Sequence, residues 1–146
     1  MNAREVIIRS LENQIEREQM FSLRWLVLRK PLGKDKGTEQ DEYEDESFHL
    51  IAIYNNILIG CARLRMISAK IGSINYVAVL PEFQNQGIGS KIVIKLIGQA
   101  KNENLEELKL KSRFYCVDFY KKLGFKESGE PFDFLGICHI PMILKL

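Results

Sequence analysis

The chain has 146 residues, of which 46% are hydrophobic and 27% are charged, and its formal net charge is +2. A chain of this length suits one domain that spans residues 1–146 and buries about two-thirds of its unfolded surface. The small net charge and the dispersed lysines argue against a nucleic-acid-binding surface. We find neither an apolar run of about twenty residues nor a signal-peptide pattern, so we expect a cytoplasmic protein that does not enter membranes.

The three cysteines bear on whether the chain has disulfides or a metal site. Cys61, Cys116 and Cys138 are odd in number, far apart and set among apolar neighbours. This arrangement favours reduced, buried thiols over disulfides or a zinc site. We therefore expect no structural metal.

The first third of the chain predicts a strand, a helical region and a loop. Residues 5–9 have the composition of a short strand, and Ser10 can cap the helix that follows. Apolar side chains keep helical spacing over residues 11–28, with a break near Gln19 left open. Residues 31–46 are polar and hold six acidic side chains between positions 39 and 46, which is typical of a solvated loop.

The rest of the chain alternates strands and helices. A hairpin is expected around Asn55 and Asn56, since asparagine tolerates the positive φ of a tight turn. The expected strands are residues 48–54, 57–66, 73–79, 108–110 and 137–144, and the expected helices are residues 87–101 and 115–122. This order predicts an α/β fold of the α+β type. Its mixed, mostly antiparallel sheet has about six to seven strands and is flanked by about four helices.

The stretch from Val77 to Gly89 carries the strongest functional signal. A β-type run ends at Pro81, a polar turn follows, and a helix opens at Gly87 and Gly89. The first N–H groups of a helix lack internal partners and attract anions, and glycines admit a ligand close to the backbone. Spacing alone fits either a phosphate cradle or a glycine-tolerant turn before a core helix.

A second motif, Phe119-Tyr120-Lys121-Lys122-Leu123-Gly124-Phe125, follows about thirty residues after Gln84-x-x-Gly87-x-Gly89. Together the two motifs resemble the GNAT superfamily of N-acetyltransferases. The ending Gly136-Ile137-x-His139-x-x-Met142 is similar to a small single-domain bacterial subgroup of that superfamily. The resemblance implies acetyl-CoA as co-substrate and a primary amine, on a small molecule or a peptide, as acceptor.

The resemblance also implies where acetyl-CoA binds. Val77 and Val79 would pair with the pantetheine arm through their backbone, and N–H groups from Gln84 to Ser90 would hold the pyrophosphate. The implied cofactor-binding residues are Val77, Ala78, Val79, Gln84, Asn85, Gln86, Gly87, Ile88, Gly89 and Ser90.

Tyr120 is the implied catalytic acid, which would protonate the departing thiolate. A phenol with a pKa near 10 is almost wholly protonated at pH 7, as an acid must be. The alternative is a core aromatic, since Val117, Tyr120 and Leu123 have helical spacing.

The sequence indicates the general base less clearly than the acid. His139 matches a subgroup position and is our candidate for a base or substrate contact, although it and His49 also suit structural roles. Glu39 and Asp41 could bind a cationic amine or lie in a solvated loop. Lys111 argues against cationic acceptors.

The missing base leaves open a rival from another class, a non-catalytic acyl-CoA binding module. A dinucleotide-binding protein is disfavoured because Gln84–Gly89 lacks the third spaced glycine. Cys116 suits a buried side chain better than a nucleophile, since no activating base is assigned to it. The acceptor, the acyl chain and the oligomeric state, a homodimer included, are left undetermined.

Overall fold

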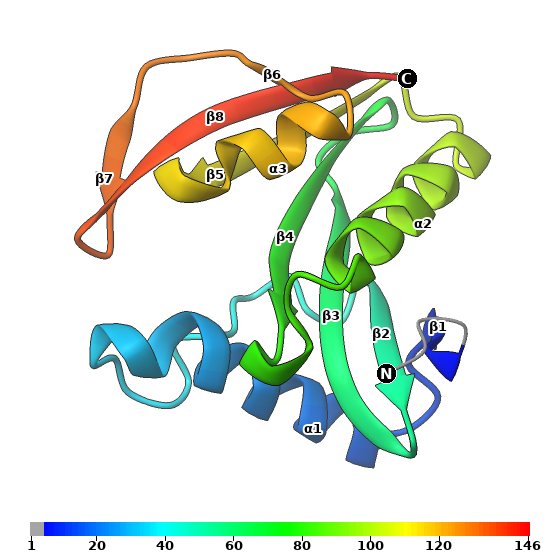
Figure 1. Ribbon diagram of the computed structural model, residues 1–146. Coiled ribbons are helices and arrows are strands. Elements are labelled where there is room, and N and C mark those ends of the chain that lie inside the picture. Colours follow the sequence, from blue (N-terminus) through cyan, green and yellow to red (C-terminus); the bar gives the residue numbers. More distant parts are fainter. Residues whose placement is uncertain (1–4) are drawn as a thin grey trace.

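The computed structural model describes residues 5–146 and has an eight-stranded sheet as its centre (Figure 1). The strands are β1 (Ile7–Ser10), β2 (Phe48–Tyr54), β3 (Ile57–Met66), β4 (Ile71–Val79), β5 (Glu107–Arg113), β6 (Lys126–Glu127), β7 (Phe132–Phe134) and β8 (Ile137–Lys145). They lie in the order β1-β2-β3-β4-β5-β8-β6, and β7 pairs with β8. Every pairing is antiparallel except that between β4 and β5, which is parallel.

The sheet confirms the predicted fold class, with two strands that the sequence pattern does not mark. β6 has two residues and β7 has three, which is too short for alternation to be recognised. The β2–β3 hairpin turns at Asn55 and Asn56, whose φ angles are 51° and 63°. Positive φ at both positions is the signature of a type I′ turn, so the predicted hairpin is confirmed.

Three α-helices flank the sheet: α1 (Gln14–Arg24), α2 (Ile88–Asn102) and α3 (Val117–Lys122). Asn13, rather than Ser10, caps α1, because its side chain accepts from the Glu16 N–H at 2.9 Å. The helix does not break at Gln19. It continues into a π-helical turn, η2 (Trp25–Arg29), and a 3₁₀ turn, η3 (Lys30–Leu32). Further 3₁₀ turns are η4 (Pro81–Phe83) and η5 (Phe114–Cys116).

The helices cover the two faces of the sheet with separate cores. Ile92 and Leu96 of α2 pack with Leu50 of β2 in the larger cluster, which also includes residues of α3. Met20 of α1 packs with Ile51 of β2 in the smaller cluster. Because neighbouring residues of a strand point to opposite faces, Leu50 and Ile51 belong to different cores. Within residues 5–146, no helix has the length and apolarity needed to cross a membrane.

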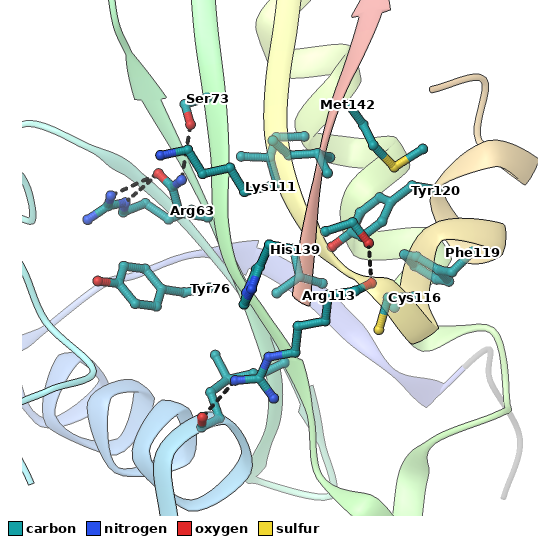
Figure 2. Close-up of a pocket in the computed structure, with 18 of the residues that line it drawn as sticks. Arg63, Ser73, Tyr76, Lys111, Arg113, Cys116, Phe119, Tyr120, His139 and Met142 are labelled. Carbon is teal, nitrogen blue, oxygen red and sulfur yellow. Dashed lines mark hydrogen bonds between the residues drawn. The ribbon is translucent and has the colours of Figure 1, made fainter. Parts of the chain in front are cut away.

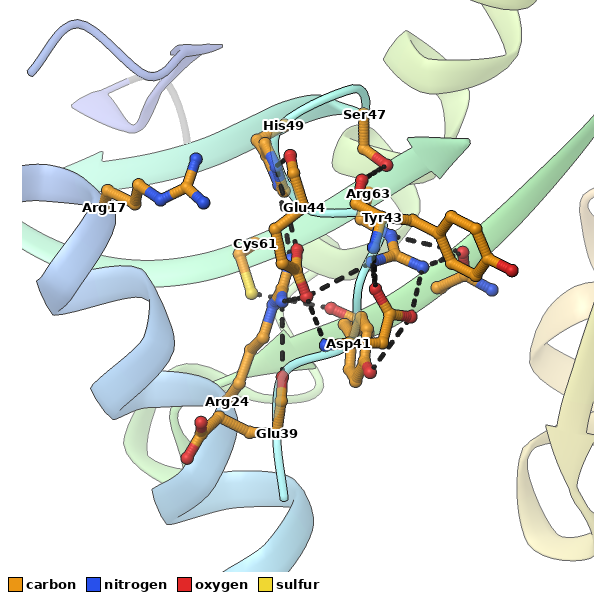
Figure 3. A network of polar contacts seen from close by, with 12 residues as sticks. Arg17, Arg24, Glu39, Asp41, Tyr43, Glu44, Ser47, His49, Cys61 and Arg63 are labelled. Atoms are coloured by element: carbon orange, nitrogen blue, oxygen red, sulfur yellow. Dashed lines mark hydrogen bonds and ion pairs between the residues drawn. The ribbon is translucent and has the colours of Figure 1, made fainter. Parts of the chain in front are cut away.

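The acidic segment is the main correction to the expected fold. Glu39 and Glu44 are only 3% and 5% exposed, so this segment is not a solvated loop. Two arginines lie beneath it: Arg24 donates to Glu44 at 2.9 Å, and Arg63 donates to Asp41 at 2.6 Å (Figure 3). A buried guanidinium needs an ionised partner, and that requirement draws the acids inward.

The cysteines also differ in part from expectation. All three are free thiols, but only Cys61 is buried, whereas Cys116 is half-buried and Cys138 is exposed. Burial raises the pKa of the Cys61 thiol to about 11.

Candidate active site

A deep cleft opens between β4 and β5 because the two parallel strands pair over only three residues each. The pairing runs from Ile71 opposite Glu107 to Ser73 opposite Lys109 and then stops. Beyond it the strands splay apart, and a cleft of about 1420 Å³ lies between them. The exposed edge of β4 therefore has backbone groups free to bind an extended ligand.

The β4 edge turns its free groups toward this cleft. A β-bulge falls at Tyr76 and Val77. Tyr76 has a φ of 55°, in the left-handed region that non-glycine residues rarely adopt. The Leu80 N–H donates to the Ile59 carbonyl of β3 at 2.8 Å. Because backbone groups alternate along an antiparallel strand, those of Val79 point away from β3 and toward the cleft.

At the end of β4, the N-terminus of α2 forms one end of the cleft. Gly87 is its N-cap residue, with a φ of 84° and no side-chain cap. The first helical hydrogen bond joins the Lys91 N–H to the Gly87 carbonyl at 3.1 Å. The N–H groups of Ile88, Gly89 and Ser90 therefore have no partner inside the helix, which makes this end suitable for an anion.

The predicted cofactor-binding residues meet at this place, with two exceptions. Those that line the cleft are Val77, Ala78, Val79, Gln84, Asn85, Gly87, Gly89 and Ser90. The Ile88 side chain is buried in the core, and the Gln86 side chain is exposed and donates to the Glu82 carbonyl at 3.3 Å. The Gln84 side-chain amide donates to the Val79 carbonyl at 2.8 Å and so fixes the turn to the strand end.

Tyr120 reaches the cleft from α3 while its ring packs in the core. The ring is 4.9 Å from Phe119 and 5.8 Å from Phe125, both edge-on, and the residue is 9% exposed. Burial, with a smaller contribution from Cys116, raises the pKa of the Tyr120 phenol. Tyr120 therefore both packs in the core and lines the cleft.

His139 stands on β8 in the same cleft. Its Nδ1 lies 2.8 Å from the Ile137 carbonyl, and Phe132 stacks on its ring. A carbonyl accepts only, so in the neutral ring we assign the proton to Nδ1, which leaves the lone pair of Nε2 available. Figure 2 shows His139 between Tyr76 on one side and Tyr120 on the other.

The other acid-base candidates belong to the buried network, although Asp41 also lines the cleft. His49 Nδ1 lies 3.2 Å from Arg24 Nη2, its Nε2 lies 2.8 Å from the Glu44 carbonyl, and it does not line the cleft. Although burial alone would raise it, the Arg63 guanidinium holds the pKa of Asp41 below its usual value. Glu39 accepts from the Gly37 N–H at 2.8 Å.

Sequence reasoning missed the arginines of the cleft. Arg29 and Arg113 both line it, although they lie 84 positions apart in the chain and share no motif. A partial signal was present on β5, where Lys109, Lys111 and Arg113 alternate with less polar residues. Alternation places the three cations on one face of the strand.

Comparisons with known proteins identify the family of this chain. The family model described as "Acetyltransferase (GNAT) domain" matches residues 30–146. The uncharacterized N-acetyltransferase YitI of Bacillus subtilis (strain 168) is 26% identical over 136 residues, covering 88% of this chain and 91% of YitI.

Solved structures show the same fold. Escherichia coli ElaA superposes with a TM-score of 0.83 at 17% identity, covering 95% of this chain and 99% of ElaA. A GNAT family acetyltransferase from Elizabethkingia anophelis, solved with acetyl-CoA bound, has a TM-score of 0.74 at 23% identity, covering 97% of this chain and 99% of that one. The match of the family model to most of the chain shows that this protein belongs to the GNAT acetyltransferase family.

Proposed function

We propose that this protein transfers an acetyl group from acetyl-CoA to a primary amine by direct attack in a ternary complex. The observation that carries the proposal is the splayed β4–β5 cleft, which has a free strand edge along one wall and an uncapped helix N-terminus at its end. These two features suit the amides and the pyrophosphate of one extended molecule. The unbroken sheet supports a single domain over residues 1–146.

The backbone of the cleft would bind the donor. Val77 and Val79 would pair with the pantetheine amides, and the N–H groups of the Gln84–Ser90 turn would hold the pyrophosphate. Gly89 supports close approach, because it lines the cleft and a Cβ there would take up space beside Phe119, 3.5 Å away, which also lines it. The Val79 N–H, which faces the cleft, would polarise the thioester carbonyl.

Two side chains would move protons. The amine nitrogen attacks the thioester carbon, the carbon–sulfur bond breaks, and the acetyl group forms an amide. His139 Nε2 would accept the proton that the amine loses, and Tyr120 would donate its proton to the sulfur. Burial raises the pKa of Tyr120 and keeps the phenol protonated, and it also raises the pKa of Cys116, so a thiolate in the same surroundings would be more basic than in water.

The test combines binding with turnover. Purified protein is titrated with acetyl-CoA and then incubated with a panel of amines while free thiol is measured. Tyr120→Phe should lower kcat by about two orders of magnitude or more and leave acetyl-CoA affinity unchanged. Tyr54→Phe is the matched control: Tyr54 does not itself line the cleft, and phenylalanine keeps the ring that packs on the cleft residue Phe83, so this variant should retain full activity.

Two outcomes would contradict the assignment. Unchanged turnover of Tyr120→Phe on a genuine substrate would remove Tyr120 as the acid. Acetyl-CoA binding with no turnover on any amine would favour a non-catalytic acyl-CoA binding module instead.

A further inference from the structure

The outer face of β5 gives the cleft a strongly basic wall. Lys109 and Lys111 are exposed and Arg113 is half-buried, whereas the alternating residues Leu108 and Leu110 are buried in the core. All three cations line the cleft. They stand on the opposite face of β5 from the core that α2 and α3 help to build, so they lie on the side of the cleft away from Tyr120.

Arg113 crosses this side of the cleft and meets a second arginine. Its Nη2 donates to the Leu28 carbonyl at the end of η2 at 2.8 Å, which Figure 2 shows as a side chain reaching from β5 to the helix below it. Arg29 Nη1 donates to the same carbonyl at 3.3 Å. Two guanidinium groups are therefore held within hydrogen-bond reach of one oxygen atom, despite their equal charges.

These cations have no carboxylate to neutralise them. Within residues 5–146, no Asp or Glu oxygen lies within 4.0 Å of Arg29, Lys111 or Arg113. Burial lowers the pKa of Arg29, and the nearby Arg113 and Arg24 charges lower it further, whereas Tyr76 and Glu39 act in the opposite direction. Like charges brought together out of water favour an anion between them.

The two guanidinium groups also have unused donors. Among residues 5–146, Arg113 donates besides Leu28 only to the Tyr115 hydroxyl at 3.0 Å, and Arg29 only to the Thr38 carbonyl at 3.1 Å. A guanidinium has five N–H donors arranged in a planar fork, which matches the two oxygens of a carboxylate.

We infer that the acceptor is a small amine that also carries a carboxylate, which Arg113 and Arg29 bind while Lys111 adds a further positive charge. The inference rests on the proposed function, since it names the acceptor class of the same cleft. It also accounts for the orientation of the acceptor: a carboxylate fixed on the wall away from Tyr120 leaves the amine to face the thioester.

The experiment compares matched acceptors. Glycine, alanine, leucine, serine and glutamate are each assayed beside the corresponding α-carboxamide, which keeps the amine and loses one negative charge. O-phosphoethanolamine represents the other anion that a guanidinium fork binds. We expect the wild-type protein to have a kcat/KM about 10- to 100-fold higher for at least one acid than for its amide.

The variant Arg113→Met separates recognition from support of the fold. If Arg113 binds the carboxylate, KM for the preferred acid rises about 10- to 100-fold and activity on its amide stays within threefold. If Arg113 merely closes the cleft against η2, activity on both falls together, which would overturn the inference. Arg17→Met is the matched control, because Arg17 pairs with Asp45 at 2.6 Å outside the cleft and should change neither value.

The remaining outcomes are also decisive. Equal use of acids and amides by the wild-type protein, or use of O-phosphoethanolamine alone, would overturn the inference and leave the proposed transferase standing. Should no amine be acetylated, the same pairs are titrated calorimetrically into the protein saturated with coenzyme A. Binding of an acid but not of its amide, abolished by Arg113→Met, would support the carboxylate site while the transferase proposal fails; no preference would overturn it.

Discussion

Two pairs of arginines lie within one small protein, and they differ in whether carboxylates neutralise their charge. Beneath the acidic segment, Arg24 and Arg63 form ion pairs with Glu44 and Asp41, in what we call the closed network (Figure 3). In the cleft, Arg29 and Arg113 share a carbonyl and have no carboxylate within 4.0 Å among residues 5–146.

The difference distinguishes arginines that stabilise the fold from arginines that are available to bind a ligand. A closed ion network resists change because removing one member leaves the others buried and unpaired. An open cluster carries its uncompensated charge where a ligand can reach it. Substitutions should therefore affect stability in the first cluster and binding in the second.

The largest expected effect is that of Glu44→Ala. Glu44 accepts from Arg24 Nη1 at 2.9 Å and lies 3.2 Å from Arg63 Nη1, so its loss leaves two buried cations short of a partner. We expect unfolding free energy, measured by urea denaturation, to fall by about 3–5 kcal/mol.

Glu42→Ala is the control, because Glu42 is exposed in the same segment and has no ion pair within 4.0 Å among residues 5–146. It should change stability by less than about 0.5 kcal/mol. Arg113→Met should cost less than Glu44→Ala does, about 1 kcal/mol, because Arg113 is half-buried and its hydrogen bonds are to the neutral Leu28 carbonyl and Tyr115 hydroxyl. Equal losses for Glu44→Ala and Arg113→Met would erase the distinction between the two clusters.

The sequence reveals local features of this molecule better than distant ones. The Asn55-Asn56 turn and the uncapped start of α2 depend on neighbouring residues, so pattern and turn chemistry predict them. The Arg63–Asp41 pair joins residues 22 positions apart, and the Arg113–Leu28 contact joins residues 85 positions apart. No local pattern records such pairs, which is why the acidic segment reads as solvated and the arginine pair is missed.

Glycines at the start of α2 allow the second prediction, which separates strain from ligand contact. Gly87 has a φ of 84° with open space around its Cβ position, so Gly87→Ala should lower stability by about 1–2 kcal/mol. Gly89 has no positive φ and its Cβ would make only ordinary contacts. Gly89→Ala should leave stability within about 0.5 kcal/mol and weaken acetyl-CoA binding about tenfold or more.

Gly98→Ala is the matched control for both variants. Gly98 lies inside α2 with no atom within 4 Å of a Cβ position, so alanine should raise stability by about 0.5–1 kcal/mol without altering acetyl-CoA affinity. Thermal melts and calorimetric titration measure the two quantities. Unchanged acetyl-CoA affinity in Gly89→Ala would argue against a ligand close to this backbone.

The third prediction uses pH to probe the closed network. Burial, together with the charge of Arg24, lowers the pKa of His49 below its ordinary value. The unfolded chain therefore binds more protons than the folded protein below about pH 6.5, and stability should fall as pH drops through that range. The slope should approach at most about 1.4 kcal/mol per pH unit.

Urea denaturation at pH 8, 6.5 and 5.5 measures this slope. His49→Gln should flatten it, because glutamine does not titrate. Asp41 also has a lowered pKa, but its contribution is lost only near and below about pH 4, outside the chosen window. Identical slopes for the wild-type protein and His49→Gln would show that the closed network does not gain protons in this way.

The smallest expected effect is a difference in the rates at which the three cysteines are alkylated, which compares the cleft with the closed network. Cys138 is exposed, Cys116 is half-buried in the cleft, and Cys61 is buried in the core beside Arg24 with a pKa raised to about 11. Because the thiolate is the reactive form, iodoacetamide should modify Cys138 first and Cys61 last. Saturating acetyl-CoA should slow modification of Cys116 alone, as followed by peptide mass spectrometry. A ligand that protected Cys61 instead of Cys116 would contradict the proposed position of acetyl-CoA.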